Sequence, residues 1–196
     1  MSEEKKTGNP LARKYTLWYS GASETRDAES FKDSIKPLAT FSTVEEFWSV
    51  YQHILRPDKV NPRTCYHLFQ EGIEPMWEDP ANKEGGRWYA WFQKGYSNRL
   101  WEDLLLAIIG NQFEKGDMIT GIEVRTRVKG DTISVWTKNS ADEEEKESVK
   151  QDFLKALNAP EGLHLDYEVF SQAMSSDHKK PKKSHWKDSK KGNYRN

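Results

Sequence analysis

The alternation of apolar and polar side chains is most regular in residues 119–129. In an extended chain, Ile122, Val124 and Val128 fall on one side. The other side receives four charged residues: Glu123, Arg125, Arg127 and Lys129. The pattern predicts a strand with one face in the core and a mainly cationic opposite face. Aromatic and β-branched runs predict the remaining strands: 15–20, 35–41, 65–69, 87–92, 132–136 (after a hairpin turn at 129–131) and 165–170.

Apolar residues spaced three and four apart predict three helices, over residues 44–54, 98–110 and 140–157. Strands and helices then follow in the order β-β-α-β-β-α-β-β-α-β, without an internal repeat. Antiparallel strands with helices on one face make an α+β domain. The expected helix caps are Ser42, with Glu45 completing a capping box, then Ser97 or Asn98, and finally Ser140, with Glu143 completing a second box.

The second expected helix carries more apolar residues than a helix on one sheet needs, since an arc of about 100° suffices. The surplus indicates either an additional surface for a partner or a deeply buried helix. The apolar residues are Leu100, Trp101, Leu104, Leu105, Leu106, Ile108 and Ile109.

Charge divides the 196-residue chain unevenly, although its formal net charge is only −1. Residues 178–196 hold eight Lys/Arg and one Asp, a net +7, which leaves 22 basic and 30 acidic residues, a net −8, for the remainder. Because residues 1–177 carry this negative net charge, we expect them to contact nucleic acid through a small site and not through a broad basic surface. The basic tail either adds weak, salt-sensitive affinity for RNA or is simply solvated. We expect a flexible arm (1–9), one domain (10–176) and a basic, disordered tail (177–196).

Several protein classes lack support in the sequence. No P-loop, dinucleotide fingerprint, nucleophile elbow or zinc-binding spacing occurs. The single cysteine, Cys65, excludes an internal disulfide framework and fits a reducing compartment. No apolar run approaches the roughly 18 residues that predict a membrane span. We therefore expect a monomeric binding protein, not an enzyme, without cofactor, metal or membrane anchor, in the cytoplasm or the nucleus.

Residues 72–87 combine loop-forming residues with a large aromatic side chain. Two prolines and the Gly85-Gly86 pair predict a loop. A tryptophan held in a loop, here Trp77, is a plate on which a planar ligand can stack. The adjacent Glu78 can accept hydrogen bonds from the edge of that ligand. The segment therefore predicts half of a base-binding clamp.

Five segments together resemble the eukaryotic translation initiation factor 4E family, in order and with similar spacing between about residues 9 and 170. They are Trp18-Tyr19-Ser20, residues 41–48 (FSTVEEFW), 72–79 (GIEPMWED), 85–88 (GGRW) and 101–107 (WEDLLLA). Three segments are more similar to class II of the family, the 4E homologous proteins: residues 18–20, 53–57 and 101–107. The presence of both Arg127 and Lys129 is more similar to the main factors.

The resemblance implies a curved antiparallel sheet with three helices on its convex face and a slot for the 7-methylguanosine cap of mRNA on the concave face. The methylated base is cationic, so it gains stacking and cation–π attraction between two aromatic plates. Trp77 is implied as one plate, and Glu78 as the acceptor for guanine's imino and amino hydrogens. The second plate falls on Phe31, where the main factors have Trp and class II usually has Tyr. The smaller ring implies weaker cap binding.

For the triphosphate, the resemblance implies contacts from Arg127 and Lys129, with Arg87 contributing indirectly. Arg125 shares their face. Trp136 corresponds to an aromatic residue near the methyl group, with a purely structural role as the alternative. A C-terminal loop with Lys179 or Lys180 is a further candidate for phosphate contact.

On the convex face, the resemblance implies binding of proteins with a Tyr-x4-Leu-Φ motif, which folds into a helix across the first two helices. Such a helix needs an aromatic anchor and an apolar floor. The main factor has Leu-Glu where this chain has Glu102-Asp103, which implies weakened binding of the 4G scaffold. The implied partner-binding residues are Pro10, Val44, Trp48, Glu102, Asp103 and Leu106.

Three functions stay open at this point. The first is a cap-binding adaptor that represses or specialises translation of selected mRNAs through repressor-type 4E-binding or 4E-transporter-type partners. The second is a general initiation factor that recruits the 4G scaffold. The third is a partner-assembly protein whose cap slot is weakened.

Overall fold

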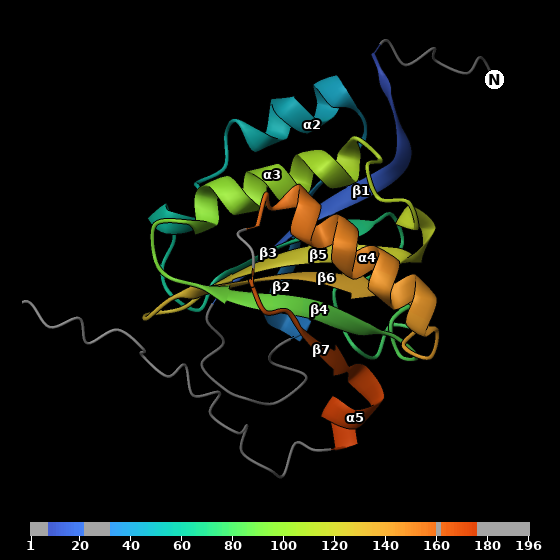
Figure 1. The fold of residues 1–196 in the computed structure, drawn as a ribbon. Coiled ribbons are helices and arrows are strands. Elements are labelled where there is room, and N and C mark those ends of the chain that lie inside the picture. Colours follow the sequence, from blue (N-terminus) through green and yellow to red (C-terminus); the bar gives the residue numbers. More distant parts are fainter. Residues whose placement is uncertain (1–7, 22–31, 160–161, 176–196) are drawn as a thin grey trace, which may run out of the picture.

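The computed structural model describes residues 8–21, 32–159 and 162–175 (Figure 1). The predicted arm up to residue 7 and the predicted tail from 177, with Lys179 and Lys180, lie outside these ranges. The elements are β1 (Pro10–Ser20), β2 (Ile35–Thr43), α2 (Val44–Tyr51), β3 (Cys65–Gln70), β4 (Gly86–Phe92), α3 (Ser97–Ile109), β5 (Ile119–Thr126), β6 (Asp131–Thr137), α4 (Glu143–Ala156), β7 (Asp166–Val169) and α5 (Phe170–Ser175), with 3-10 turns at Pro57–Lys59 and Gly116–Met118.

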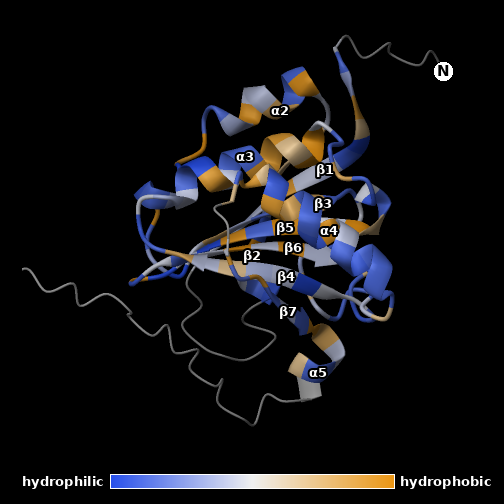
Figure 2. Ribbon diagram, in the orientation of Figure 1, coloured by the Kyte–Doolittle hydropathy of each residue, from blue (hydrophilic) through white to orange (hydrophobic). Residues whose placement is uncertain are grey.

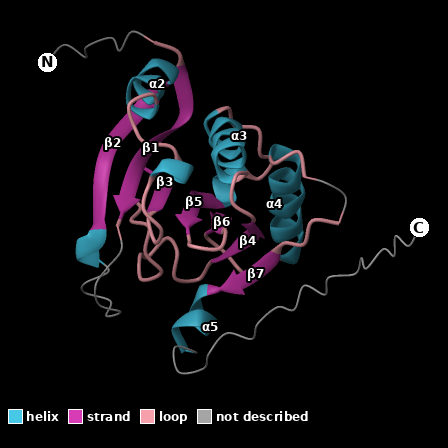
Figure 3. Cartoon of the chain, turned by 90° about the vertical axis from the view of Figure 1, so that its left-hand side faces the viewer, coloured by secondary structure: helices cyan, strands magenta, loops and turns pink. Residues whose placement is uncertain are grey.

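The described strands form one curved antiparallel sheet in the order β2-β1-β3-β5-β6-β4-β7. Helices α2, α3 and α4 cover one face of it, and α5 lies beyond β7, away from these three helices (Figures 1 and 3). The α+β class and the predicted order of strands and helices are therefore confirmed as far as β7, and α5, which begins where the last strand was expected to end, is an additional helix. Within the described residues, no helix has the length and apolar character needed to cross a lipid bilayer.

The main core lies between the sheet and the helices. Phe47 and Tyr51 of α2 and Val149 and Phe153 of α4 are almost fully buried there. Figure 2 shows hydrophobic and hydrophilic positions mixed along α2 and α3, whereas α4 is mostly hydrophilic. Deep burial accounts for most of the apolar surplus of α3, although two of its leucines are only partly buried. The fully or nearly fully buried apolar residues of α3 are Trp101, Leu104, Leu105, Ala107, Ile108 and Ile109.

Strand β5 confirms the predicted alternation but ends earlier than expected. Ile122 and Val124 are in the core, and Glu123 between them faces the opposite side of the sheet. The strand ends at Thr126, because the backbone N–H of Arg127 donates to Asp131 Oδ1 and turns the chain. Val128 is consequently 73% exposed, so its predicted place in the core is wrong.

The predicted helix caps are displaced by one or two residues. Thr43, not Ser42, caps α2 by accepting from the backbone N–H of Glu46. The α4 cap is Asp142 rather than Ser140, and α3 begins at Ser97 with Tyr96 in the cap position. Neighbouring polar residues have nearly equal capping preference, so tertiary contacts decide between them.

The glycine pair before β4 is required by close packing. A Cβ atom on Gly85 would lie 1.8 Å from the carbonyl oxygen of Thr137, and one on Gly86 would lie 2.5 Å from that of Glu168. Only glycine lets β4 enter between β6 and β7 at this point. The pair thereby fixes where the preceding loop, residues 71–85, meets the sheet.

Candidate functional site

A second aromatic cluster covers the sheet face opposite the three helices. Its buried members are Phe69, Trp136 and Phe170. Trp77 packs against them and is itself only partly buried. The rings of Trp77 and Phe170 are nearly parallel, at 16°, with centroids 6.0 Å apart. Phe170 in turn lies 4.5 Å from the Trp136 ring. Phe170 therefore supports the Trp77 indole, which stays partly exposed.

The loop that carries Trp77 is held by its own side chains. Asp79 accepts hydrogen bonds from the backbone N–H groups of Glu74 (2.9 Å) and Ala81 (2.8 Å). The fully buried Asn82 donates to the carbonyl oxygens of Glu74 (3.0 Å) and Met76 (2.8 Å). The predicted loop is thus internally bonded, and Trp77 is positioned before any ligand arrives. Glu78, next to it, is exposed.

The residue predicted to oppose Trp77, Phe31, lies outside the described residues. Its neighbour Lys32 is described, and its Nζ lies 3.9 Å from Glu74 Oε2 in the Trp77 loop. The chain that follows Phe31 therefore returns beside this loop.

A buried charged cluster lies in the same sheet face. Glu123 is only 1% exposed, and its carboxylate oxygens lie 3.1 Å from His67 Nδ1, 3.3 Å from Arg125 Nε and 3.4 Å from an Arg87 nitrogen. Burial raises the pKa of Glu123, but Arg125, His67 and Arg87 outweigh it and hold that pKa well below its usual range. Glu123 correspondingly raises the pKa of Arg125. The cluster is a compensated network of ion pairs.

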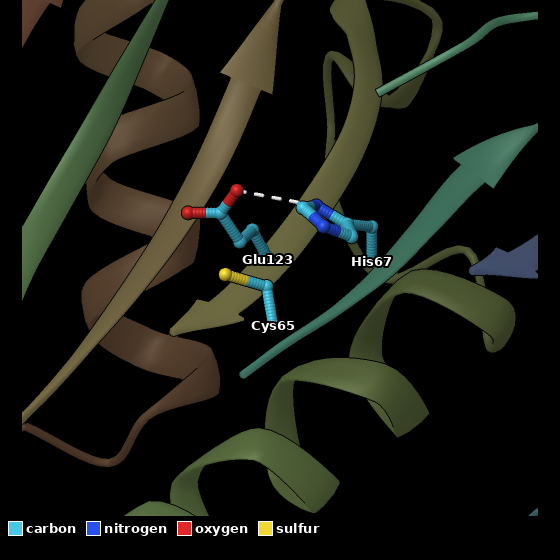
Figure 4. Close-up of side chains that lie close together, drawn as sticks. All are labelled: Cys65, His67 and Glu123. Atoms are coloured by element: carbon cyan, nitrogen blue, oxygen red, sulfur yellow. Dashed lines mark ion pairs between the residues drawn. The ribbon is translucent and has the colours of Figure 1, made fainter. Parts of the chain in front are cut away.

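Cys65, His67 and Glu123 bring potential metal-ligand atoms within 4.8 Å of one another (Figure 4). Burial raises the pKa of the Cys65 thiol, which opposes formation of the thiolate that a metal requires. The carboxylate is already shared by two guanidinium groups, so a divalent cation would face two positive charges at close range. We therefore assign this cluster a structural role.

The cationic residues predicted to bind phosphate differ in availability. Arg87 is only 12% exposed and pairs with Glu168 at 2.7 Å as well as with Glu123, so its charge is compensated. Arg127 and Lys129 are exposed in the β5–β6 connection, and no ion pair to either occurs among the described residues. Trp136, predicted near the methyl group, is only 2% exposed behind Phe170.

The residues predicted to bind a partner lie on the helix side. Trp48 of α2 is 38% exposed and packs edge-on against Phe47 and Tyr51. Pro10 is paired with Thr43, directly before Val44, at the start of the same helix.

In α3, Glu102 is bonded to Arg56 and accepts from the Tyr51 hydroxyl at 3.2 Å, which ties α3 to α2. Asp103 and Leu106 instead line a groove toward α4. The structure thus places Pro10 next to the start of α2, which carries Val44 and Trp48, and joins Glu102 to the end of that helix, whereas Asp103 and Leu106 line the groove between α3 and α4.

A family model described as eukaryotic initiation factor 4E matches residues 10–185, which is most of the chain. The chain belongs to the eukaryotic initiation factor 4E family. This match confirms the resemblance inferred from the sequence. The family consists of cap-binding translation initiation factors and not of enzymes.

Members of the 4E family with different names match about equally well. The factor NCBP of Triticum aestivum is 39% identical over 167 residues, which cover 85% of this chain and 72% of the relative. Factor 4E-1 of Phaseolus vulgaris is 41% identical over 155 residues, covering 79% and 67%. The solved complex of C. elegans eIF4E-3 with the 4E-binding protein Mextli and cap analog has a TM-score of 0.81 and 38% identity, covering 86% of this chain and 96% of that one.

Sequence reasoning missed residues that hold the Trp77 loop and its aromatic support in place. Phe170 ends the predicted strand 165–170, and no local pattern indicates that it stacks on Trp77. Asp79 and Asn82 read only as polar loop residues, yet they hold the loop. One signal was available for the buried cluster, because Glu123 interrupts the cationic side of an otherwise regular strand.

Proposed function

We propose that this chain binds the 7-methylguanosine cap of mRNA on the sheet face opposite α2, α3 and α4. The observation that carries the proposal is Trp77, backed by Phe170 on a self-bonded loop, with the exposed Glu78 beside it. A cationic purine on the exposed side of Trp77 gains roughly 1–3 kcal/mol from stacking and 0.5–2 kcal/mol from cation–π attraction. Glu78 accepts hydrogen bonds from the guanine edge. The complex of the C. elegans relative with cap analog supports this proposal.

The rest of the slot is proposed from the same chemistry. Phe31 forms the second plate, and the contact between Lys32 and Glu74 supports its place near Trp77. Arg127 and Lys129 bind the triphosphate. Because Arg87 is already paired with two carboxylates, it contributes through water. We assign Trp136, buried behind Phe170, the structural role.

Calorimetric titration with 7-methylguanosine triphosphate and with GTP tests the cap proposal. The methylated ligand is expected to bind about tenfold or more tightly, because only its base carries the positive charge that the aromatic plates attract. Affinity for both ligands should fall as salt rises, since both contact Arg127 and Lys129 through phosphate. Equal affinity for the two ligands would contradict the proposal and favour a partner-assembly protein with a weakened slot.

We further propose that a helical peptide with a Tyr-x4-Leu-Φ motif binds across α2 and α3, and that the protein regulates translation of selected mRNAs in the cytoplasm. The exposed Trp48 supplies an aromatic anchor. Glu102 is occupied by Arg56 and Tyr51, and it puts a charge where the main factor has leucine, which disfavours the 4G scaffold. The relative bound to the 4E-binding protein Mextli supports a partner of this class. A general initiation factor is the alternative.

Replacing Trp48 with alanine is expected to weaken binding of a repressor-type 4E-binding peptide by roughly thirtyfold, since buried interface tryptophans contribute about 2 kcal/mol or more. Fluorescence anisotropy with labelled repressor-type and 4G-type peptides measures this loss and compares the two partner classes. Tighter binding of the 4G-type peptide by the wild type would favour the general factor. Cap affinity should be unchanged, and joint loss of peptide and cap would show that Trp48 acts as a core residue instead.

A further inference from the structure

One large aromatic side chain on the cap-binding face has no role in the slot. Trp91, on β4, is 52% exposed, whereas Trp136 and Phe170 on the same face are buried. Its strand neighbours Ala90 and Phe92 pack into the main core. Alternation along the strand therefore directs Trp91 to the opposite face, the one that carries Arg87.

The Trp91 indole is held against the turn between β5 and β6. A Cβ atom on Gly130 would lie only 2.2 Å from Cζ2 and 2.3 Å from Cε2 of the indole. The indole therefore rests directly on the backbone of Gly130, and any larger residue there would displace it. With this support on one side and about half of its surface exposed, Trp91 is a preorganised plate rather than a mobile side chain.

Exposed cations lie in the turn on which this plate rests. Arg127 and Lys129 are exposed in the connection that contains Gly130. The nearest acid in this connection, Asp131, is fully buried and is engaged by Lys94 and by the backbone N–H of Arg127. Arg63, also exposed, donates its backbone N–H to Thr126 at the end of β5. An aromatic plate among exposed cations matches a nucleotide, whose base stacks and whose phosphate is anionic.

Strand register relates the position of this plate to that of the aromatic cluster around Trp136. Arg87 pairs with Trp136 at the aromatic cluster, and Trp91 pairs with Thr132 at the other end of β4 and β6. Four residues of extended chain separate Arg87 from Trp91, about 13 Å. The span leads from the aromatic cluster to the end of β4 that packs on the β5–β6 connection, which contains Arg127 and Lys129.

We propose that Trp91 stacks on the base of the first nucleotide after the triphosphate of a capped RNA. The plate thereby adds affinity for the transcript itself to affinity for the cap. This inference rests on the proposed cap-binding function and names a second subsite next to the cap slot. Because every base has a stacking face, the subsite is expected to accept any of the four bases.

The experiment compares 7-methylguanosine triphosphate with the cap dinucleotide m7GpppA by calorimetry, which avoids the change in tryptophan fluorescence. For the wild type, the added nucleotide is expected to improve affinity about fivefold or more. Trp91→Leu should lose this gain and bind 7-methylguanosine triphosphate within about twofold of wild type, while Trp91→Phe should keep most of the gain. Leu55→Ala, which removes a 61% exposed apolar side chain beside the α3-bound Arg56, is the control and should keep all of it.

The outcomes separate the two proposals. If 7-methylguanosine triphosphate binds but the added nucleotide brings no gain, the second subsite is wrong and the cap function stands. If Trp91→Leu retains the gain, the nucleotide does not stack on Trp91, and the proposed subsite is wrong while the cap function stands. If neither ligand binds the wild type, the cap function fails and the subsite fails with it.

Discussion

Trp77→Ala is expected to weaken binding of 7-methylguanosine triphosphate by roughly thirtyfold to several-hundredfold, a loss of about 2–4 kcal/mol. The substitution removes a plate that Phe170 supports and that Asp79 and Asn82 position before the ligand binds. Stacking and cation–π attraction are therefore lost together. Calorimetric titration of wild type and variant under identical salt measures the effect.

Two further variants test whether the loss of affinity comes from the aromatic ring of Trp77. Trp77→Phe keeps an aromatic face and should fall between wild type and alanine. Glu78→Gln keeps the plate but loses the charged acceptor, so it should weaken binding while the preference for the methylated ligand over GTP persists. Because Trp77 also packs on the aromatic cluster, thermal unfolding of each variant is required as a control. A folded Trp77→Ala variant with wild-type affinity would refute the proposed slot.

Glu123→Gln is expected to lower the free energy of unfolding by about 3–5 kcal/mol at pH 7, because it leaves the guanidinium groups of Arg125 and Arg87 without their buried counter-charge. Glu168→Gln is the matched control. It also removes a carboxylate from Arg87, but Glu168 is one-third exposed, so the loss should be about 1 kcal/mol or less. Urea unfolding followed by circular dichroism compares the three proteins.

The stabilisation from Glu123 should decrease as the pH falls. The pKa of Glu123 is lower in the folded protein than in the unfolded chain, where it is about 4.3. Its contribution is therefore fully present above that value and is lost as the pH falls toward the folded pKa. The difference in unfolding free energy between wild type and Glu123→Gln should narrow between about pH 5 and pH 3. A difference that is constant or grows on acidification would show that Glu123 is not ionised in the folded protein.

The elements of the fold were largely predictable because their signals are local. Alternation in β5 and the three-and-four spacing in α3 arise from the geometry of a single strand or helix, and both were found. The residues at which helices and strands begin and end were predicted less accurately. Thr43 and Asp142 cap helices for which Ser42 and Ser140 were expected, since adjacent polar residues compete almost equally until packing selects one.

The sequence alone was enough to identify the 4E family, and it nominates Trp77 and Glu78 as candidates for cap binding because both stand in one short, distinctive segment. Three features required the folded chain: the support of Trp77 by Phe170, the network around Glu123 and the plate at Trp91. The register of the antiparallel sheet determines the second of these, because it brings His67 on β3 beside Glu123 on β5. The packing of loops and turns against the sheet determines the other two. All three join residues far apart in the chain, so no local pattern encodes them.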